Sequence, residues 1–473
     1  MKKYFIKVFI SLCITFSFAQ NTVVGPKFDF DQKSEIDPRI VLADNYNYYL
    51  FSIINRDGMM AKHEIVFRKF DQKNQLIDTY KQNFAIDLFT LHNYRGGFEL
   101  DNNKLVVFVE SYSNKRKVSE LIQYTFDKKT NAFDTKVVVS YPIESLSKSG
   151  DFSVSQSPSK QYFGIIYKKH NTKKEPENSD CLLLDGKSLA QLWKKSVSFS
   201  DEFYSSEKVT TNSGKIIFVR EPRGYKETPY LVQISQENQE NKTFEEDTRI
   251  QKPITFSIGT QDYLMCFNYK RKGVRGGDFG NFMLYDLNGG RVLKNNPIDD
   301  FNRTPKIKDV IIRKVDLENN EIRVFTEGIY ESGTKPVTTS FGSTMQEPKY
   351  NFGPAHLLVF SFEGDLKQNI KLENNPDAEP ELFQSYGVMN IKGNYVVQCG
   401  LSVKSNNFYY GFYKLNPNNK FEKSSISCNY SENGHYGYKN INQVIYYFND
   451  TNNFLVSRLY NDGQMALVTF PLN

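Results

Sequence analysis

A short hairpin pattern recurs along this chain and limits what the chain can fold into. It is clearest at Leu284–Leu293, LYDLNGGRVL, where apolar residues lead into an Asp-x-x-Gly turn and then resume. Asp, Asn or Glu followed by Gly or Asn suits turn positions that need a positive φ or an Asx hydrogen bond, so each copy predicts a β-hairpin. Seven further copies, of which the one at Leu231 is the loosest, begin at Phe67, Tyr124, Leu182, Leu231, Val359, Phe412 and Ser457. Eight copies indicate a repeat architecture.

A second element, a dense apolar run, precedes each hairpin. The eight runs end at Ile54, Val109, Tyr167, Arg220, Tyr269, Thr326, Gly400 and Phe448. A shorter strand-like piece, such as Asp151–Ser155, comes before several of these runs. The unit is therefore four strands, and four-stranded antiparallel units of roughly 50 to 55 residues in series predict an all-β fold, a β-propeller. We expect eight blades, or seven if one unit is shared or degenerate; a pair of β-sandwiches is the alternative.

The domain organisation follows from composition. With 38 Phe, 30 Tyr and a single Trp, apolar burial relies on residues that favour strands. No Pro-rich or Ser-rich linker separates the repeats, so residues 38–473 are expected to form one propeller domain. Residues 20–37 precede the first full repeat, and the strand-like piece within Thr22–Asp31 could close the structure against the last repeat.

Residues 1–19 have the three parts of a secretory signal peptide. Lys2, Lys3 and Lys7 come first, an apolar run extends from Val8 to Phe18, and the small residue Ala19 follows. A membrane anchor is the alternative, but the run is about half of the ~20 residues that span a bilayer. Cleavage would remove three lysines and lower the net charge from +6 to about +3. We expect an exported protein of the periplasm or the outer membrane or cell surface, with no transmembrane segment.

The cysteines and histidines give no metal-site spacing. Cys181, Cys266, Cys399 and Cys428 each lie in or beside an apolar run, so buried free thiols are favoured, with a Cys399–Cys428 disulfide as the alternative. The five histidines lie in different repeats. A GxSxG elbow and an HExxH motif are absent, and the sequence predicts no catalytic residue, metal or cofactor.

The polar loops between the second and third strands of the units are rich in lysine and arginine. In an antiparallel blade these loops emerge on one face, so we expect a positive face that favours an anionic partner. Solvated turns without function are the alternative. The richest loop, YKRKGVRGGDFG, predicts ligand contacts from Tyr269, Lys270, Arg271, Lys272 and Arg275, and other loops add Arg116, Lys168 and Arg223. Nucleic acid is disfavoured by export and the modest net charge.

The longest insertion is Glu327–Gly353 in the sixth unit. A loop of this length inside a compact repeat is usually functional or disordered, and its aromatic residues favour a binding lid. From this segment we predict that Tyr330 and Tyr350 contact a ligand.

The Asp-x-x-Gly hairpins after apolar strands, the Phe-Ala-Gln junction at residues 18–20 and the bias towards Asn, Lys, Tyr and Phe resemble exported β-propeller proteins of Bacteroidota-type bacteria. The resemblance covers roughly residues 38–470 and implies fold and export. The function predicted from the sequence is a binding or scaffold module, a monomer or part of a larger complex, that engages an anionic glycan or an envelope protein through the basic loop face. A polysaccharide lyase or glycoside hydrolase on the same fold is the alternative.

Overall fold

The computed structural model describes residues 22–55, 63–84, 90–101, 103–172, 175–200, 202–223, 228–244, 248–270, 279–298, 307–338, 344–372, 386–391, 394–399, 407–415, 421–429, 441, 443–460 and 462–471. Within these residues the chain is almost entirely strand, with a single 3₁₀ turn, η1, at Leu146–Lys148. The expectation of an all-β fold is therefore confirmed.

In the described part of the chain, seven consecutive sheets each contain four antiparallel strands in chain order. The first blade has β3 (Glu35–Val41), β4 (Asn47–Ile54), β5 (Glu64–Asp71) and β6 (Leu76–Asn83). The second has β7 (Thr90–Glu99), β8 (Lys104–Ser113), β9 (Val118–Asp127) and β10 (Ala132–Pro142). The third has β11 (Asp151–Gln156), β12 (Tyr162–Lys168), β13 (Glu177–Asp185) and β14 (Gln191–Phe199). The fourth has β15 (Phe203–Thr210), β16 (Ile216–Pro222), β17 (Tyr230–Ile234) and β18 (Gln239–Thr243).

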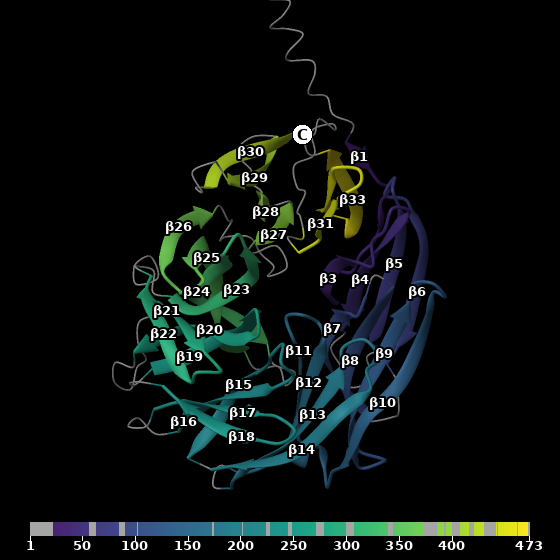
Figure 1. The fold of residues 1–473 in the computed structure, drawn as a ribbon. Coiled ribbons are helices and arrows are strands. Elements are labelled where there is room, and N and C mark those ends of the chain that lie inside the picture. Colours follow the sequence, from purple (N-terminus) through teal and green to yellow (C-terminus); the bar gives the residue numbers. More distant parts are fainter. Residues whose placement is uncertain are drawn as a thin grey trace, which may run out of the picture.

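The remaining three blades repeat this plan. The fifth has β19 (Thr248–Ile258), β20 (Gln261–Lys270), β21 (Phe279–Asp286) and β22 (Arg291–Pro297). The sixth has β23 (Ile307–Glu318), β24 (Glu321–Thr338), β25 (Thr344–Ser361) and β26 (Leu366–Leu372). The seventh has β27 (Tyr386–Ile391), β28 (Asn394–Cys399), β29 (Asn407–Leu415) and β30 (Phe421–Asn429). Figure 1 shows these blades arranged in a ring with the first strand of each nearest the centre, which is a β-propeller.

The last sheet differs from the seven blades and joins the two ends of the described chain. It contains β31 (Ile445–Phe448), β32 (Asn453–Leu459) and β33 (Gln464–Pro471), and its outer position is taken by β1 (Val23–Val24) and β2 (Phe28–Asp29). We call it the closing sheet. Val23 pairs with Thr469, and Phe28 pairs with Met465. Eight blades built on one plan are therefore not supported. The hairpin at Ser457 joins the second and third strands of this sheet, because the N-terminal strands take the outermost place.

The repeated hairpin owes its shape to the aspartate that begins the turn. In the β21–β22 turn, Asp286 Oδ1 accepts hydrogen bonds from the N–H groups of Asn288 and Gly289, at 3.0 and 2.8 Å. Gly290 then adopts a φ of 67°, which glycine tolerates without steric cost. Asp71 caps the β5–β6 turn in the same way, where Asn74 takes the positive φ of 60°. The Asx-turn interpretation of the repeat is therefore confirmed in these two copies.

The core lies between adjacent blades. The second strands are buried on both faces: nine of the ten residues of β8 are buried, whereas β6, an outer strand, is mostly exposed. Tyr49, Phe67 and Phe126 pack between the first and second blades, and equivalent clusters fill the other junctions. Because each sheet depends on both neighbours for burial, the ring must close for every face to be covered.

A buried side chain of the first blade bonds the N-terminal and the C-terminal strand of the closing sheet. Asn74 is 1% exposed, and its Oδ1 accepts hydrogen bonds from the hydroxyls of Tyr48 and Thr469, at 2.8 and 2.9 Å. Its Nδ2 donates to the carbonyl oxygen of Val23 at 2.9 Å. The amide therefore joins β4, β33 and β1 at the point where the ring closes.

Candidate binding face

The alternation of antiparallel strands sends the connections of every blade to two opposite faces. The connections between second and third strands, and those between consecutive blades, share one face, which we call the loop face. The connections between first and second and between third and fourth strands share the other, which we call the turn face. The predicted contact residues come from loop-face connections, so this face is considered first.

The residues predicted from the richest loop fall at the end of β20 or beyond it. Tyr269 and Lys270 are the last residues of β20, where they pair with Arg249 and Thr248. Arg271, Lys272 and Arg275 lie outside the described residues. The prediction that this loop contacts a ligand therefore stays a prediction.

The other predicted bases are mostly paired with acids of their own blade. Arg116 Nη2 lies 2.8 Å from Glu120 Oε2, and the Arg116 side chain remains 49% exposed. Lys168 Nζ lies 3.9 Å from Glu177 Oε2, a looser pair with the lysine 29% exposed. These contacts reduce the positive charge expected of the loop face. Arg223 is exposed, and its guanidinium carbon lies 5.8 Å from the centre of a tyrosine ring.

Arg220, which ends one of the apolar runs, is fully buried in β16. Its Nη1 lies 2.7 Å from Glu177 Oε2 of the third blade, and its Nη2 donates to the carbonyl oxygens of Ser200 and Phe203. Burial would raise the pKa of Glu177, but the charge of Arg220 and the hydrogen bonds from Ser205 and Arg220 lower it below the usual value. The pair joins two blades and is a structural element.

Three buried glutamates escaped the sequence analysis. Glu110, Glu221 and Glu327 are 0 to 2% exposed and follow the apolar residues of β8, β16 and β24. Glu110 accepts a hydrogen bond from the N–H of Phe152 in the next blade at 3.1 Å, and Glu221 does the same for Ile250 at 3.1 Å. The signal was present as Val-Phe-Val-Glu, Phe-Val-Arg-Glu and Val-Phe-Thr-Glu. Glu110 and Glu221 are thus buried carboxylates in second strands that each bond the next blade, and these bonds fix the spacing of the blades they join.

Two histidines that the sequence placed in separate repeats lie together at the junction of the first two blades. The ring centres of His63 and His92 are 6.2 Å apart, and both rings contact Phe84. Burial lowers the pKa of His63. Among the described residues, no group of three or more His, Cys, Asp or Glu side chains is arranged to hold a metal ion.

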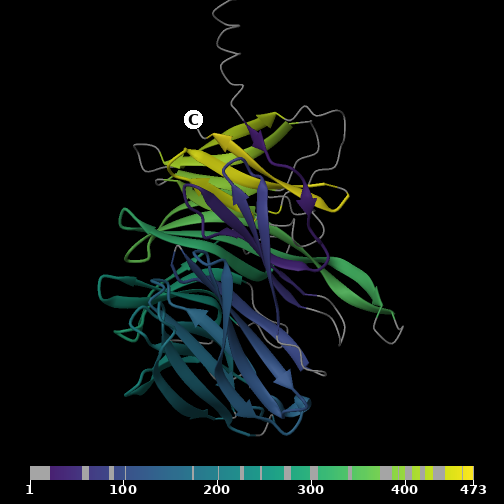
Figure 2. The same cartoon turned by 90° about the vertical axis from the view of Figure 1, so that its right-hand side faces the viewer.

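The sixth-unit insertion is ordered as strand in its described residues. β24 and β25 each run for 18 residues and pair with each other as far as Thr338 opposite Thr344. β23 accompanies β24 only to Tyr330, and β26 accompanies β25 only to Ala355. The described residues 331–338 and 344–350 therefore form a two-stranded ribbon, which we call the arm. Figure 2 shows the arm extending away from the ring.

The predicted contact residues Tyr330 and Tyr350 lie at the base of the arm. Tyr330 is half-buried and pairs with Asn351, and Tyr350 pairs with Glu331. The register shifts between Glu331 and Gly333, and Gly333 has a φ of 144°, so a β-bulge marks the start of the free part of the arm. The described part of the insertion is therefore a projecting ribbon rather than a loop, and its role as a binding lid stays a prediction.

Proline interrupts both outer edges of the arm. Pro336 pairs with Gln346, and Pro348 pairs with Thr334, two positions away. Proline has no N–H to donate, so it fits the pairs of an antiparallel ribbon whose backbone N–H positions point away from the partner strand. Each free edge of the arm therefore lacks a donor, which hinders another strand from adding to it. A partner would therefore contact the faces of the arm.

Cysteine positions agree with free thiols where side chains are described. Cys181 and Cys266 are buried and unbridged, and burial raises the pKa of Cys181 to about 12. Cys399 lies in β28 and Cys428 in β30, with β29 between them. The side chains of Cys399 and Cys428 lie outside the part of the structure that is described, so a disulfide between them stays an open alternative. No helix among the described residues has the length and hydrophobicity to span a membrane.

No protein-family model and no curated protein matches this chain. Solved structures do resemble it. The Dos1 propeller aligns at 9% identity over 96% of each chain with a TM-score of 0.45. The β-propeller domain of the Trilobed protease from Pyrococcus furiosus aligns at 12% identity over 84% of this chain and 96% of its own, with a TM-score of 0.39. An ulvan lyase of a polysaccharide lyase family aligns at 9% identity over 78% and 90%, with a TM-score of 0.36. All three TM-scores are below 0.5, and the assignment of this chain as a β-propeller rests on its own ring of seven four-stranded blades.

Proposed function

We propose that this protein is an exported β-propeller that serves as a binding or scaffold module and holds an envelope protein against its loop face. The observation that carries the proposal is the arm, which leaves the loop face of the sixth blade and whose described residues pair only with each other as strands. Its eight residues Glu331–Thr338 reach about 25 Å at the usual rise of a strand.

The physical argument is one of stability. A two-stranded ribbon is at best marginally stable in water, and Glu331–Thr334, the residues of the arm whose side chains are described, are all exposed. A ribbon held clear of the ring gains stability when a partner covers one of its faces. The ring offers a rigid base, because buried glutamates bond consecutive blades on the same side.

The pairing of loop-face bases with acids bears on the choice between an envelope protein and an anionic glycan as the partner. Arg116 and Lys168 each face a carboxylate of their own blade, so the described part of the loop face has less free positive charge than the sequence suggested. This favours a protein partner over an anionic glycan. Export rests on the signal-peptide pattern of residues 1–19.

The test is site-specific photo-crosslinking in envelope preparations of the native host. A photoreactive residue replaces Thr334 on the arm, and in the matched control it replaces Thr130, an exposed threonine of the β9–β10 turn on the turn face. The proposal expects a specific protein adduct from position 334 and none from position 130. An identical pattern from both positions, or none from 334, would contradict it.

A second variant separates protein from glycan. Tyr330 and Asn351 are cross-strand partners, so replacing residues 331–350 by Asn-Gly should close the hairpin with a two-residue turn and preserve the blade. This arm-less variant should no longer co-purify with the protein that is captured from position 334, and it should keep its melting temperature. Retention on an anionic polysaccharide resin that falls only when Lys270, Arg271, Lys272 and Arg275 are reversed in charge would instead support the anionic glycan. Cleavage of that polysaccharide would support the lyase or hydrolase alternative.

A further inference from the structure

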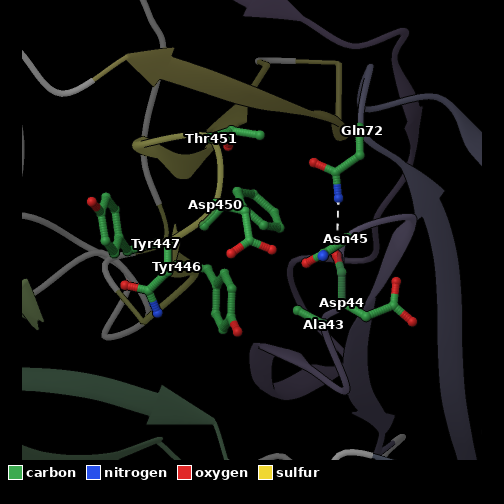
Figure 3. Close-up of a pocket in the computed structure, with 10 residues that line it drawn as sticks. Ala43, Asp44, Asn45, Gln72, Tyr446, Tyr447, Asp450 and Thr451 are labelled. Carbon is green, nitrogen blue, oxygen red and sulfur yellow. Dashed lines mark hydrogen bonds between the residues drawn. The ribbon is translucent and has the colours of Figure 1, made fainter.

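A small pocket lies on the turn face, where the first blade meets the closing sheet. Its walls come from the β3–β4 connection, from Gln72 in the β5–β6 turn, and from the end of β31 with the turn that follows it. Figure 3 shows these segments facing one another across the gap. The pocket is therefore remote in the fold from the arm and from the loop-face bases.

One wall is aromatic. Tyr446 is half-buried, and its ring centre lies 5.1 Å from that of Phe448, at an interplanar angle of 62°. Phe448 packs in turn on Tyr48 of the first blade, at 5.5 Å. Tyr447 points to the other side of β31, where its hydroxyl donates to Asn452 Oδ1 at 2.6 Å. Tyr446 thus presents a supported aromatic ring to the pocket.

The opposite wall is polar and held in place by its turn. Asp44 Oδ1 accepts hydrogen bonds from the N–H groups of Tyr46 and Asn47, and its Oδ2 lies 2.7 Å from Lys128 Nζ. Burial would raise the pKa of Asp44, but Lys128 and these two N–H groups lower it. The carbonyl oxygen of Asp44 accepts a hydrogen bond from Gln72 Nε2 at 3.1 Å. The Asp44 carboxylate is thus occupied by contacts within the protein, whereas the Oε1 atom of Gln72 can still bind a ligand.

The groups that can meet a ligand are amides, a hydroxyl and one carboxylate. The Asp450 carboxylate points into the gap towards Asn45 in Figure 3, and Thr451 lies on the same turn. Asn45 and Gln72 supply both donors and acceptors from the first blade. The lining contains no lysine or arginine, and because Asp44 is paired with Lys128, Asp450 is the aspartate whose negative charge an anionic ligand would meet.

We propose that this pocket binds one uncharged sugar ring. A sugar ring has an apolar C–H face, which packs on an aromatic side chain such as Tyr446, and a rim of hydroxyls, each both donor and acceptor. Asp450, Asn45 and Gln72 match that rim. A volume of about 230 Å³ falls below the usual ~300–1,000 Å³ of drug-sized sites, so the pocket accepts one ring rather than an extended chain.

The position of the pocket adds a consequence. Its walls belong to the first blade and to the closing sheet, so the sugar contacts both sides of the junction that completes the ring. A ligand that binds only when these walls are together stabilises the closed ring, and the melting temperature should rise with sugar concentration.

The experiment uses the mature protein and a panel of methyl glycosides of glucose, galactose, mannose and N-acetylglucosamine, with methyl glucuronide as the anionic counterpart. Saturation-transfer NMR and calorimetry measure binding, which for so small a ligand should have a Kd on the order of 1 mM. At least one neutral glycoside should bind, and the glucuronide should bind at least about tenfold more weakly.

Variants assign the binding to this pocket. Tyr446→Ala and Asp450→Asn should each weaken binding about tenfold or more. Tyr446→Phe should keep most of the affinity, which excludes a folding defect as the cause. The matched control Asp134→Asn, an exposed aspartate of β10, and the arm-less variant should bind like the wild type. Absence of binding to every neutral glycoside, equal binding of the glucuronide, or affinity unchanged in both Tyr446→Ala and Asp450→Asn would overturn the proposal.

Discussion

Breaking the buried Glu177–Arg220 pair should destabilise the junction of the third and fourth blades. Glu177 and Arg220 are 0% exposed, and Glu177 also accepts a hydrogen bond from the N–H of Ser205 at 3.0 Å. In Glu177→Gln, the guanidinium of Arg220 stays buried without a countercharge. Removing one partner of a buried ion pair costs about 3–5 kcal/mol. Because glutamine keeps one acceptor oxygen, we expect a loss of about 3 kcal/mol in the free energy of unfolding.

A double-mutant cycle distinguishes the ion pair from a general packing defect. Arg220→Met removes the buried positive charge and leaves Glu177 without its arginine partner, at a similar loss of stability. Glu177→Gln combined with Arg220→Met leaves no unpaired charge. The double variant should therefore lose clearly less than the sum of the single losses, with a coupling of about 2 kcal/mol or more. Denaturant midpoints measure the total, and hydrogen exchange of the Ser205 amide measures the local effect. A loss below about 1 kcal/mol for Glu177→Gln, or strictly additive losses, would refute the reasoning.

The pH dependence gives an independent check. The pKa of Glu177 is lower in the folded protein than its ordinary value of 4.5. A carboxyl group with a lowered folded pKa contributes stability that is complete above the unfolded pKa and is lost as the pH falls through the folded one. The difference in stability between wild type and Glu177→Gln should therefore be constant near pH 7 and shrink below about pH 4.5. A difference that does not change with pH would contradict this explanation.

Three further outcomes are expected. Asn74→Ala should lower the free energy of unfolding by about 2–4 kcal/mol, because it leaves two buried hydroxyls without their acceptor and places alanine at a φ of 60°. Amide exchange of β1 and β33 measures the loss. Gly164→Ala should destabilise the third blade by about 1–3 kcal/mol, since an added Cβ would lie 2.1 Å from Thr210 Oγ1; a melting temperature equal to that of the wild type would contradict this. The lowered pKa of His63 means that stability falls as the pH drops through its unfolded value of about 6.5. His63→Phe, which keeps the packing on Phe84, should flatten the decline in melting temperature between pH 7 and 5.

The repeat could be predicted from the sequence because its physics is local. The Asx hydrogen bonds of Asp71 and Asp286 form within four residues, so the turn can be predicted from the local sequence. The double-sided burial of second strands is likewise visible as a continuous apolar run. These two signals were enough for the fold class and the four-strand unit.

What escaped prediction depends on contacts between distant residues. Arg220 resembles a surface base until Glu177 of the neighbouring blade is placed beside it. The pocket on the turn face is lined by Tyr446 and Asn45, which come close to each other only when the ring closes. The insertion that contains the arm was interpreted as a loop. Its strands contain Gly333, Pro336 and Pro348, which a bulge and edge positions accommodate.

The origin of the outermost strands in the closing sheet has a consequence for how the molecule is assembled. Lys27 and Asp462, which meet beside β2, are 435 positions apart, so the first segment finds its place only after β33 exists. Until then the completed blades form an open arc with one bare flank at each end. The N-terminal strands and the last hairpin therefore become ordered together, and because this contact spans most of the chain it carries a large entropy cost of loop closure.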